Sequence, residues 1–431
     1  MIRYLYAIAA AACRLLPDLR IAPLTPRRRR LLVSGAMLAA ATVLAEQPAA
    51  APGWELERWT ATWGAAPEAG ASNAAVSLAA HGGRNPTANQ TANQTIRLVA
   101  TASLGGNRVR VRLSNETGSA PLRIGAARIG LRASGSSVAP GTDRPLRFGG
   151  ATAPVLAPGA PALSDPVELN VPPLAQLVVS LYLPDAVALP PGAAAPPPQA
   201  GHAAYLSPPG DHTAAATLPV QRALAGAPFL TAVEVDTAGA ALVLLGDARA
   251  GWSALLARRL HGERRARIGV VDRGADGDRL LGSAPGHAQQ RFDRDVLATG
   301  GVRYLVLQLG GVDVADGAAL RPPTADEMVA GYRQLLVRAR AARLRVIGTT
   351  LAPFEGAAAW SAEKEALRQA VNAWIRTGGE FDAVLDADRA LRDPLRPARL
   401  LPAYDSGDHL RPSEAGLQAL ADAAPLALLA E

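Results

Sequence analysis

Residues 241–260, ALVLLGDARAGWSALLARRL, constrain the fold of this chain more than any other stretch. An unbroken apolar run ends at Gly246-Asp247 and changes almost at once to the periodicity of an amphipathic helix. A run of this kind indicates a strand that is buried on both faces, as in a parallel sheet covered by helices. In open sheets of this type, ligands bind outside the carboxyl ends of the strands. We therefore expect a functional site at the turn formed by Gly246, Asp247 and Ala248.

The alternation of strand and helix continues to the C-terminus. Further strands are predicted at 266–271, 302–310, 344–351 and 381–387, and helices at 291–300, from Thr324, at 361–377 and at 412–429. Thr324 and Glu327 have the spacing of a capping box, and Ser361 opens the next helix. Five strands that alternate with helices predict a flavodoxin-like, three-layer α/β/α domain over residues 236–431.

Residues 54–235 show a different pattern of short period-two segments separated by Gly, Pro, Asn and Ser. The segments 95–104 and 108–115 flank Gly105-Gly106-Asn107 and start a predicted series of β-hairpins. Further strands are expected at 121–132, 145–150, 167–171 and 176–184. In 108–113, arginines alternate with apolar residues, which predicts one buried and one solvated face. This part of the chain is therefore predicted to be an antiparallel β-sandwich domain.

The first 50 residues have the pattern of an export signal. Arg27 to Arg30 precede the apolar stretch LLVSGAMLAAATVLA, and small residues near Ala45 or Ala51 offer a cleavage site. The pair Arg28-Arg29 resembles a twin-arginine signal, although the Sec route stays open. A permanent membrane anchor is the alternative, but an apolar stretch of about 15 residues is short for a bilayer span. We expect a secreted or periplasmic protein with no stable membrane anchor after the leader is removed.

The distribution of charge argues against a nucleic acid partner. The formal net charge is +7, but seven arginines and Asp18 give residues 1–45 a charge of +6, which leaves +1 for the rest. Phosphate binding requires a concentrated basic face, which this remainder lacks. The single cysteine, Cys13, lies in the leader, so the mature chain has no disulfide. The histidines lack metal-ligand spacing, and we expect neither a metal site nor a cofactor.

Four blocks of the second half resemble the SGNH/GDSL hydrolases, a family of esterases and acylhydrolases, and the first half is similar to the β domain of one secreted bacterial branch. In this family a serine directly after Gly-Asp attacks an ester carbonyl. A glycine amide and an asparagine side chain help to form the oxyanion hole, and a late Asp-x-x-His supplies the base and the acid that orients it. The resemblance implies the fold and position of an esterase site.

The first two blocks match the family in part. Ala248 occupies the position of the nucleophilic serine and has no reactive group. In the second block, Gly274 and Gly277 fit the family pattern, and a backbone donor could persist there. Asp272 and Asp278 stand where the family usually has asparagine.

The last two blocks have also changed. Aligned with Gly-x-Asn-Asp, the third block reads Gly311-Val312-Asp313-Val314, which puts the carboxylate of Asp313 in the place of an amide donor. In the fourth block Asp408 matches the orienting acid. Arg411 takes the position of the histidine, and an arginine stays protonated and cannot act as a base.

Three interpretations follow. The first is a secreted relative without catalytic activity that binds an ester, a glycan or a partner through the β domain or the altered cleft. The second is an active serine esterase with a rebuilt triad that uses Ser253, Ser283 or Ser406 together with His287 or His409. Ser253 also fits a helix N-cap or a solvent-facing residue, and His409 also fits an ordinary hydrogen-bonded loop residue. The third is a structural envelope protein, so enzymatic activity stays undecided.

The resemblance makes two spatial predictions. Homologous blocks should bring four residues together at the carboxyl edge of the sheet: Ala248, Gly277, Asp313 and Asp408. Arg411 should form an ion pair with one of the carboxylates of the altered site, because acids gathered without a cation would raise one another's pKa. The candidate partners are Asp408, Asp313 and Asp247.

Overall fold

The computed structural model describes residues 58–67, 90–189, 204–247, 251–263, 267–275, 277–282, 286–315 and 321–429. Residues Arg58–Glu431 form one compact unit. The predicted export signal, Ala248 and Ser283 lie outside the described residues. Within the described part, no helix has the length and apolar character needed to cross a membrane.

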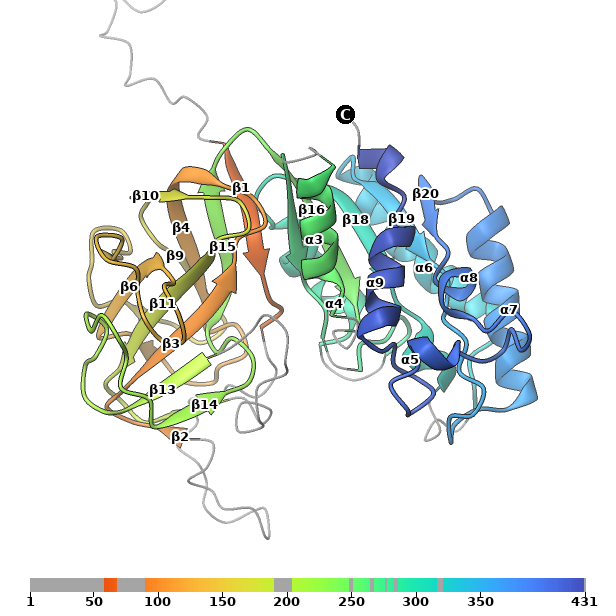
Figure 1. Ribbon diagram of the computed structural model, residues 1–431, viewed down its shortest axis with the longest axis horizontal. Coiled ribbons are helices and arrows are strands. Elements are labelled where there is room, and N and C mark those ends of the chain that lie inside the picture. Colours follow the sequence, from red (N-terminus) through yellow and green to blue (C-terminus); the bar gives the residue numbers. More distant parts are fainter. Residues whose placement is uncertain are drawn as a thin grey trace, which may run out of the picture. The chain divides into compact units, whose positions relative to one another are not determined.

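The first half of the described chain is built from two antiparallel sheets (Figure 1). One has the order β1 (Trp59–Gly64), β15 (Leu230–Asp236), β4 (Gly106–Ser114), β10 (Val167–Val171), with β9 (Pro161–Leu163) also paired to β4. The other has the order β14 (Arg222–Leu224), β13 (Ala204–Pro209), β3 (Gln94–Thr101), β11 (Gln176–Leu183), β6 (Ala126–Leu131), β7 (Arg144–Pro145). Two short pairs complete it, β2 (Gln90–Thr91) with β12 (Val187–Ala188) and β5 (Leu122–Arg123) with β8 (Val155–Leu156). One apolar core joins both sheets, as expected of a sandwich.

The predicted hairpin between 95–104 and 108–115 is wrong. These segments become β3 and β4, which lie in different sheets and do not pair with each other. β3 is buried along nearly its whole length, because it lies between β11 and β13. On β4, alternate residues are buried as predicted, and the arginines of its other face form ion pairs, such as Arg110 with Glu234 at 2.6 Å. This face is therefore internally neutralised.

The second half forms the predicted parallel sheet. Its order is β17 (Ile268–Asp272), β16 (Ala240–Gly246), β18 (Val302–Gln308), β19 (Arg345–Thr349), β20 (Ala383–Leu385), and every neighbouring pair is parallel. This order is that of flavodoxin-like sheets, in which the order of the strands reverses at the first strand of the sheet, here β16. The fold class is therefore confirmed, and the carboxyl end of β16 lies at the switch point of the sheet.

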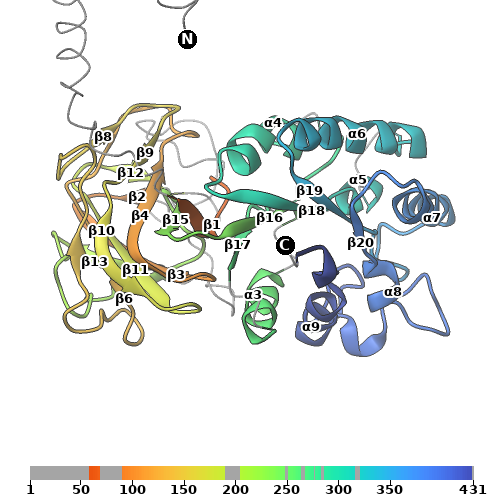
Figure 2. The same cartoon turned by 90° about the horizontal axis from the view of Figure 1, so that it is seen from above.

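Helices cover both faces of this sheet (Figure 2). One core contains residues of α4 (Ala288–Phe292), α6 (Ala325–Ala341) and α7 (Ala362–Thr377), and the opposite core contains residues of α3 (Ser253–Gly262), α8 (Ala387–Leu391) and α9 (Glu414–Ala423). Shorter helical segments are α5 (Gly311–Ala315), a π-helical turn (Asp293–Leu297) after α4, and 3₁₀ turns η5 (Pro402–Tyr404) and η6 (Leu426–Leu429). The capping box of Thr324 and Glu327 is present, and the Ser361 side chain accepts from the amide of Lys364.

Side chains of both halves hold the edge strand β17 to the first half. The Ser103 hydroxyl accepts a 2.8 Å hydrogen bond from the Val270 amide. Arg273, directly after β17, donates from Nη1 to the carbonyls of Ala65 and Thr231, both at 2.6 Å. Burial lowers the pKa of Arg273 to about 10. The unpaired edge of β17 is thereby covered, and the start of the second sequence block is fixed in place.

Candidate functional site

The turn after β16 lies against the neighbouring strand β18. A Cβ at Gly246 would come within 2.0 Å of the Gln308 carbonyl oxygen, so this position requires glycine. The Gly246 carbonyl accepts from the Ala275 amide at 2.9 Å, which joins the first and second sequence blocks. The local pattern therefore places Asp247 at the carboxyl edge of the sheet, as predicted.

The amides of the two block-two glycines are both engaged by carboxylates. Gly274 N donates to Asp272 Oδ1 at 2.9 Å, and Gly277 N donates to Asp247 Oδ1 at 3.2 Å. In the resembling family a glycine amide stabilises the oxyanion of the reaction. Here each amide already has an acceptor, and that acceptor belongs to an acidic side chain. An oxyanion at either amide would have to displace a carboxylate and would lie close to it.

The expected role of Asp313 as a residue of the cleft is wrong. Its side chain is buried in α5, where Oδ2 accepts from Leu280 N and Oδ1 from Leu281 N, both at 2.8 Å. Both oxygens therefore fix the loop that follows the second block. The family pattern Gly-x-Asn-Asp also fits Gly310-Gly311-Val312-Asp313, which makes Asp313 the aspartate of the motif. In that alignment Val312 takes the asparagine position, and the amide donor is still missing.

Asp408 and Arg411 form the predicted ion pair. Arg411 Nε lies 3.2 Å from Asp408 Oδ2, and the two side chains are 55% and 36% exposed. Asp408 Oδ1 accepts from the amides of Leu410 and Arg411 and from the Ser406 hydroxyl. Burial raises the pKa of Asp408, but these hydrogen bonds and the positive charge of Arg411 lower the pKa by a larger amount. The pKa of Asp408 therefore lies below its usual value. The described contacts of Asp408 lie within its own loop and do not reach Gly277 or Asp313.

The same loop contains a histidine–aspartate pair that the sequence analysis did not predict. His409 Nδ1 lies 2.5 Å from Asp405 Oδ2, and Asp405 Oδ1 accepts from the amides of Gly407 and His409. His409 has φ of 61°, a left-handed conformation that is costly for a residue other than glycine. Burial raises the pKa of Asp405, but its donors lower it more. The spacing Asp-x-x-x-His is the sequence signal that could have suggested this pair.

The other residues of the rebuilt triad are dispersed. Ser253 is the first residue of α3, and the N-cap position belongs to Trp252, so the expected capping role of Ser253 is wrong. Ser406 donates its hydroxyl hydrogen to Asp408 at 3.1 Å. His287 precedes α4, and its buried Nδ1 finds no hydrogen-bond partner among the described residues.

Asp278 of the second block belongs to a cluster of buried charged side chains. Asp278 pairs with Arg291, whose Nη1 also lies 2.5 Å from Asp295 Oδ2. Burial raises the pKa of Asp278 to about 6, although Arg291 opposes the shift. The pKa of Asp295 is lowered instead. Burial raises it, but the nearby guanidinium groups of Arg294 and Arg291 lower it by a larger amount. The cation that balances Asp278 is therefore Arg291, a residue that the family pattern did not indicate.

A small pocket lies at the carboxyl end of β16. It is lined by Leu244, Leu245, Gly246, Asp247, Trp252, Asp272, Gly274 and Gln308. Trp252 Nε1 donates to Gln308 Oε1 at 2.7 Å and closes one side of it. Sequence analysis missed Gln308, because it ends an apolar strand and belongs to no motif. Within the described residues, no group of three or more His, Cys, Asp or Glu could hold a metal ion.

The last block lies on the same side of the sheet as this pocket. α9, which follows it, packs on α3, and Arg259 of α3 donates to the Ala421 carbonyl at 2.6 Å (Figures 1 and 2). The structure thus joins the loop that carries Asp247 to the loop that carries Gly274 and Gly277, and Asp313 anchors the residues that follow the second loop. Asp408 and Arg411 form a separate pair in a neighbouring loop. Ala248 lies outside the described residues, so the predicted meeting of all four positions stays a prediction.

Comparison with known proteins finds a family model that matches part of the chain. Residues 235–419 match the model of the GDSL-like lipase/acylhydrolase family. No curated protein matches the chain.

Several solved structures are similar to part of the chain. A GDSL-like lipase from Bacteroides thetaiotaomicron is 18% identical over 42% of this chain and 84% of its own, with a TM-score of 0.32. Axe2, an acetylxylan esterase from Geobacillus stearothermophilus, is 20% identical over 45% and 96%, with a TM-score of 0.36. LAE5, an alpha/beta hydrolase from the Lake Arreo metagenome, has the same identity, coverage and score.

Proposed function

We propose that this protein, whose residues 235–419 match the model of the GDSL-like lipase/acylhydrolase family, is an exported relative that binds its ligand without serine-dependent acyl transfer. The ligand class that the family favours is an ester or an esterified glycan. The pocket beside Asp247 and Trp252 is the proposed binding position. Export, with cleavage near Ala45 or Ala51, is part of the proposal and is checked by the N-terminus of the mature protein.

The observation that carries the proposal is the engagement of both glycine amides. The amides of Gly274 and Gly277 donate to the carboxylates of Asp272 and Asp247. Acyl transfer would need amide donors of this kind for the oxyanion, and carboxylates already occupy them. Loss of a single oxyanion donor commonly costs about 10²–10³ in rate. Carboxylates in the same position add repulsion to that loss.

The nucleophile and base positions support the same conclusion. Ala248 has no group that could attack a carbonyl. Arg411 cannot accept a proton, and its guanidinium is paired with Asp408, the acid that would orient a base. Each change by itself would be severe, and together they remove the chemistry of the triad.

The first experiment separates binding from turnover. Purified protein is mixed with p-nitrophenyl butyrate, and nitrophenolate release and tryptophan fluorescence are followed together. We expect a saturable fluorescence change without release, because Trp252 lines the pocket. The variant Trp252→Phe is the matched control and should lose the signal. Turnover together with labelling by a serine-directed phosphonate would overturn the proposal.

The His409–Asp405 pair favours a second candidate function. With Nδ1 held by Asp405, the ring nitrogen Nε2 is free to accept a proton, and the side chain is 42% exposed. His409 could take a proton from water as the water oxygen attacks an ester carbonyl, and then return that proton to the leaving alkoxide to give acid and alcohol. This hydrolysis needs no serine.

A separate assay tests this candidate. Slow release of nitrophenolate that resists the phosphonate, is lost in His409→Gln and persists in Ser253→Ala would support hydrolysis by His409. Release that is unchanged in His409→Gln would exclude it.

A further inference from the structure

Leu395 is an unusual surface residue. Its side chain is 91% exposed, more than any other large apolar side chain in the described part of the chain. Isolated apolar residues are common on protein surfaces. Leu395, however, lies between Pro394 and Pro397 at the end of a loop that joins α8 to η5. The question is therefore whether the loop holds the Leu395 side chain in this exposed position.

The loop is a closed and well-bonded projection. Leu391 and Leu400 are buried at its base, and residues 392 and 400 form an antiparallel bridge. Asp393 N donates to the Arg399 carbonyl at 2.9 Å, and Leu395 N donates to Asp393 Oδ1 at 2.8 Å. The backbone thus holds Leu395 outward, away from the core.

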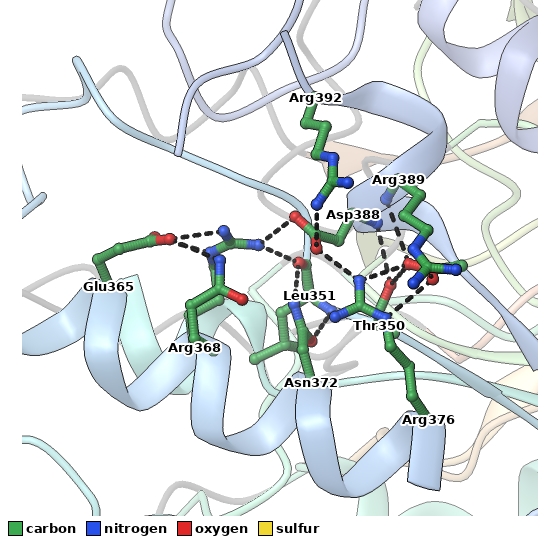
Figure 3. A network of polar contacts seen from close by, with 11 residues as sticks. Thr350, Leu351, Glu365, Arg368, Asn372, Arg376, Asp388, Arg389 and Arg392 are labelled. Atoms are coloured by element: carbon green, nitrogen blue, oxygen red, sulfur yellow. Dashed lines mark hydrogen bonds and ion pairs between the residues drawn. The ribbon is translucent and has the colours of Figure 1, made fainter. Parts of the chain in front are cut away.

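A buried polar network fixes the start of the same loop (Figure 3). Asp388 of α8 is fully buried and pairs with Arg368 at 2.7 Å and with Arg376 at 2.5 Å. Arg392, the first residue of the projection, lies 3.7 Å from the same carboxylate. Ion pairs that are largely shielded from solvent therefore connect α8, the helix that precedes the loop, to α7.

The same loop and its base carry exposed arginines, of which Arg389 is paired with Asp386. Arg396 follows Leu395 directly and is exposed, and Arg389 is 68% exposed at the base. A second loop carries a similar sequence pair, Leu410, which is 40% exposed, and Arg411, which is 55% exposed and paired with Asp408.

Both loops pack on one turn. Glu355 N donates to the Ala398 carbonyl at 2.8 Å, and a Cβ on the adjacent Gly356 would meet the His409 ring at 3.0 Å. Two neighbouring loops thus each present an exposed Leu-Arg pair.

We propose that these two loops, 391–401 and 405–412, dock on an anionic lipid bilayer. Leucine side chains gain free energy by entering the interface below the headgroups, and guanidinium groups bind the phosphates above them. A soluble polyanion would attract the arginines but would give the leucines no apolar environment. The expected contact is peripheral and reversible.

Vesicle co-sedimentation of the full chain tests the proposal. Binding should appear with phosphatidylglycerol-containing vesicles, be weaker with phosphatidylcholine alone, and fall with added salt. Arg396→Gln should lower the affinity about fivefold, and Leu395→Asn about tenfold. Val155→Asn, which alters a side chain 60% exposed on β8, is the control and should bind as the parent does. Since every variant keeps the basic leader, differences between variants report the loops alone.

A local probe gives a second readout. In a Cys13→Ser background, Leu395→Cys is labelled with an environment-sensitive fluorophore, whose emission should shift to the blue with anionic vesicles. Adding Arg396→Gln should reduce this shift about fivefold at limiting lipid. Unchanged emission on saturating vesicles, together with equal sedimentation of Leu395→Asn and the parent, overturns the proposal. A shift produced equally by heparin, or by raising the protein concentration without lipid, also overturns it in favour of a polyanion or a second copy.

Discussion

Replacing Asp313 tests the most consequential assignment in the site. If its carboxylate holds Leu280 N and Leu281 N, Asp313→Ala leaves two buried amides without an acceptor. Hydrogen bonds to a charged group contribute about 1.5–3 kcal/mol each, so the free energy of unfolding should fall by about 3–6 kcal/mol. Asp313→Asn keeps one acceptor oxygen and should cost about half as much. Urea unfolding, with stability taken from the midpoint and slope, measures both values.

Val312 supplies the control for this series. Its side chain is half-buried on the same short helix, and Val312→Ala should cost less than about 1.5 kcal/mol, because it removes two carbons and no hydrogen bond. If Asp313 instead faced the cleft as an altered oxyanion residue, Asp313→Asn would be neutral or stabilising. A loss below about 1 kcal/mol in Asp313→Ala would refute the anchoring role.

Three further predictions concern the site and its surroundings. Ala248→Ser alone should give no esterase activity, because Arg411 still occupies the base position; nitrophenyl ester turnover by this single variant would contradict the proposed function. The pKa of Asp278 is raised from 3.8 to about 6, so its contribution to stability is complete below 3.8 and is lost as pH rises to about 6. Urea unfolding should show this loss, up to about 3 kcal/mol, in the parent but not in Asp278→Asn. Arg368→Met should cost about 3–5 kcal/mol, because the buried Asp388 loses one of its cations and Glu365 loses its partner. Arg389→Met alters an exposed arginine and should stay within about 0.5 kcal/mol; equal costs in thermal unfolding would be inconsistent with the network in Figure 3.

Local patterns determined much of the fold. The five parallel strands were predicted because each is a continuous apolar run, which is what burial on both faces requires. Thr324 and Ser361 were recognised as caps because a cap is satisfied by the helix it begins. The Gly246-Asp247 turn was placed correctly because a strand followed at once by a helix brings such a turn to the edge of the sheet.

Only the tertiary structure decided which groups meet. β3 and β4 are adjacent in sequence but belong to different sheets, because the partners of β3 lie about 80 and 110 residues away, as the spacing of β11 and β13 shows. The carboxylate of Asp313 is buried because it accepts hydrogen bonds from two amides of another loop. No sequence pattern within its own block indicates these partners. Asp272 and Asp247 occupy the glycine amides for the same reason. The sequence names the acids and amides of the site, but an acceptor finds its donor only when loops from separate strands fold against each other.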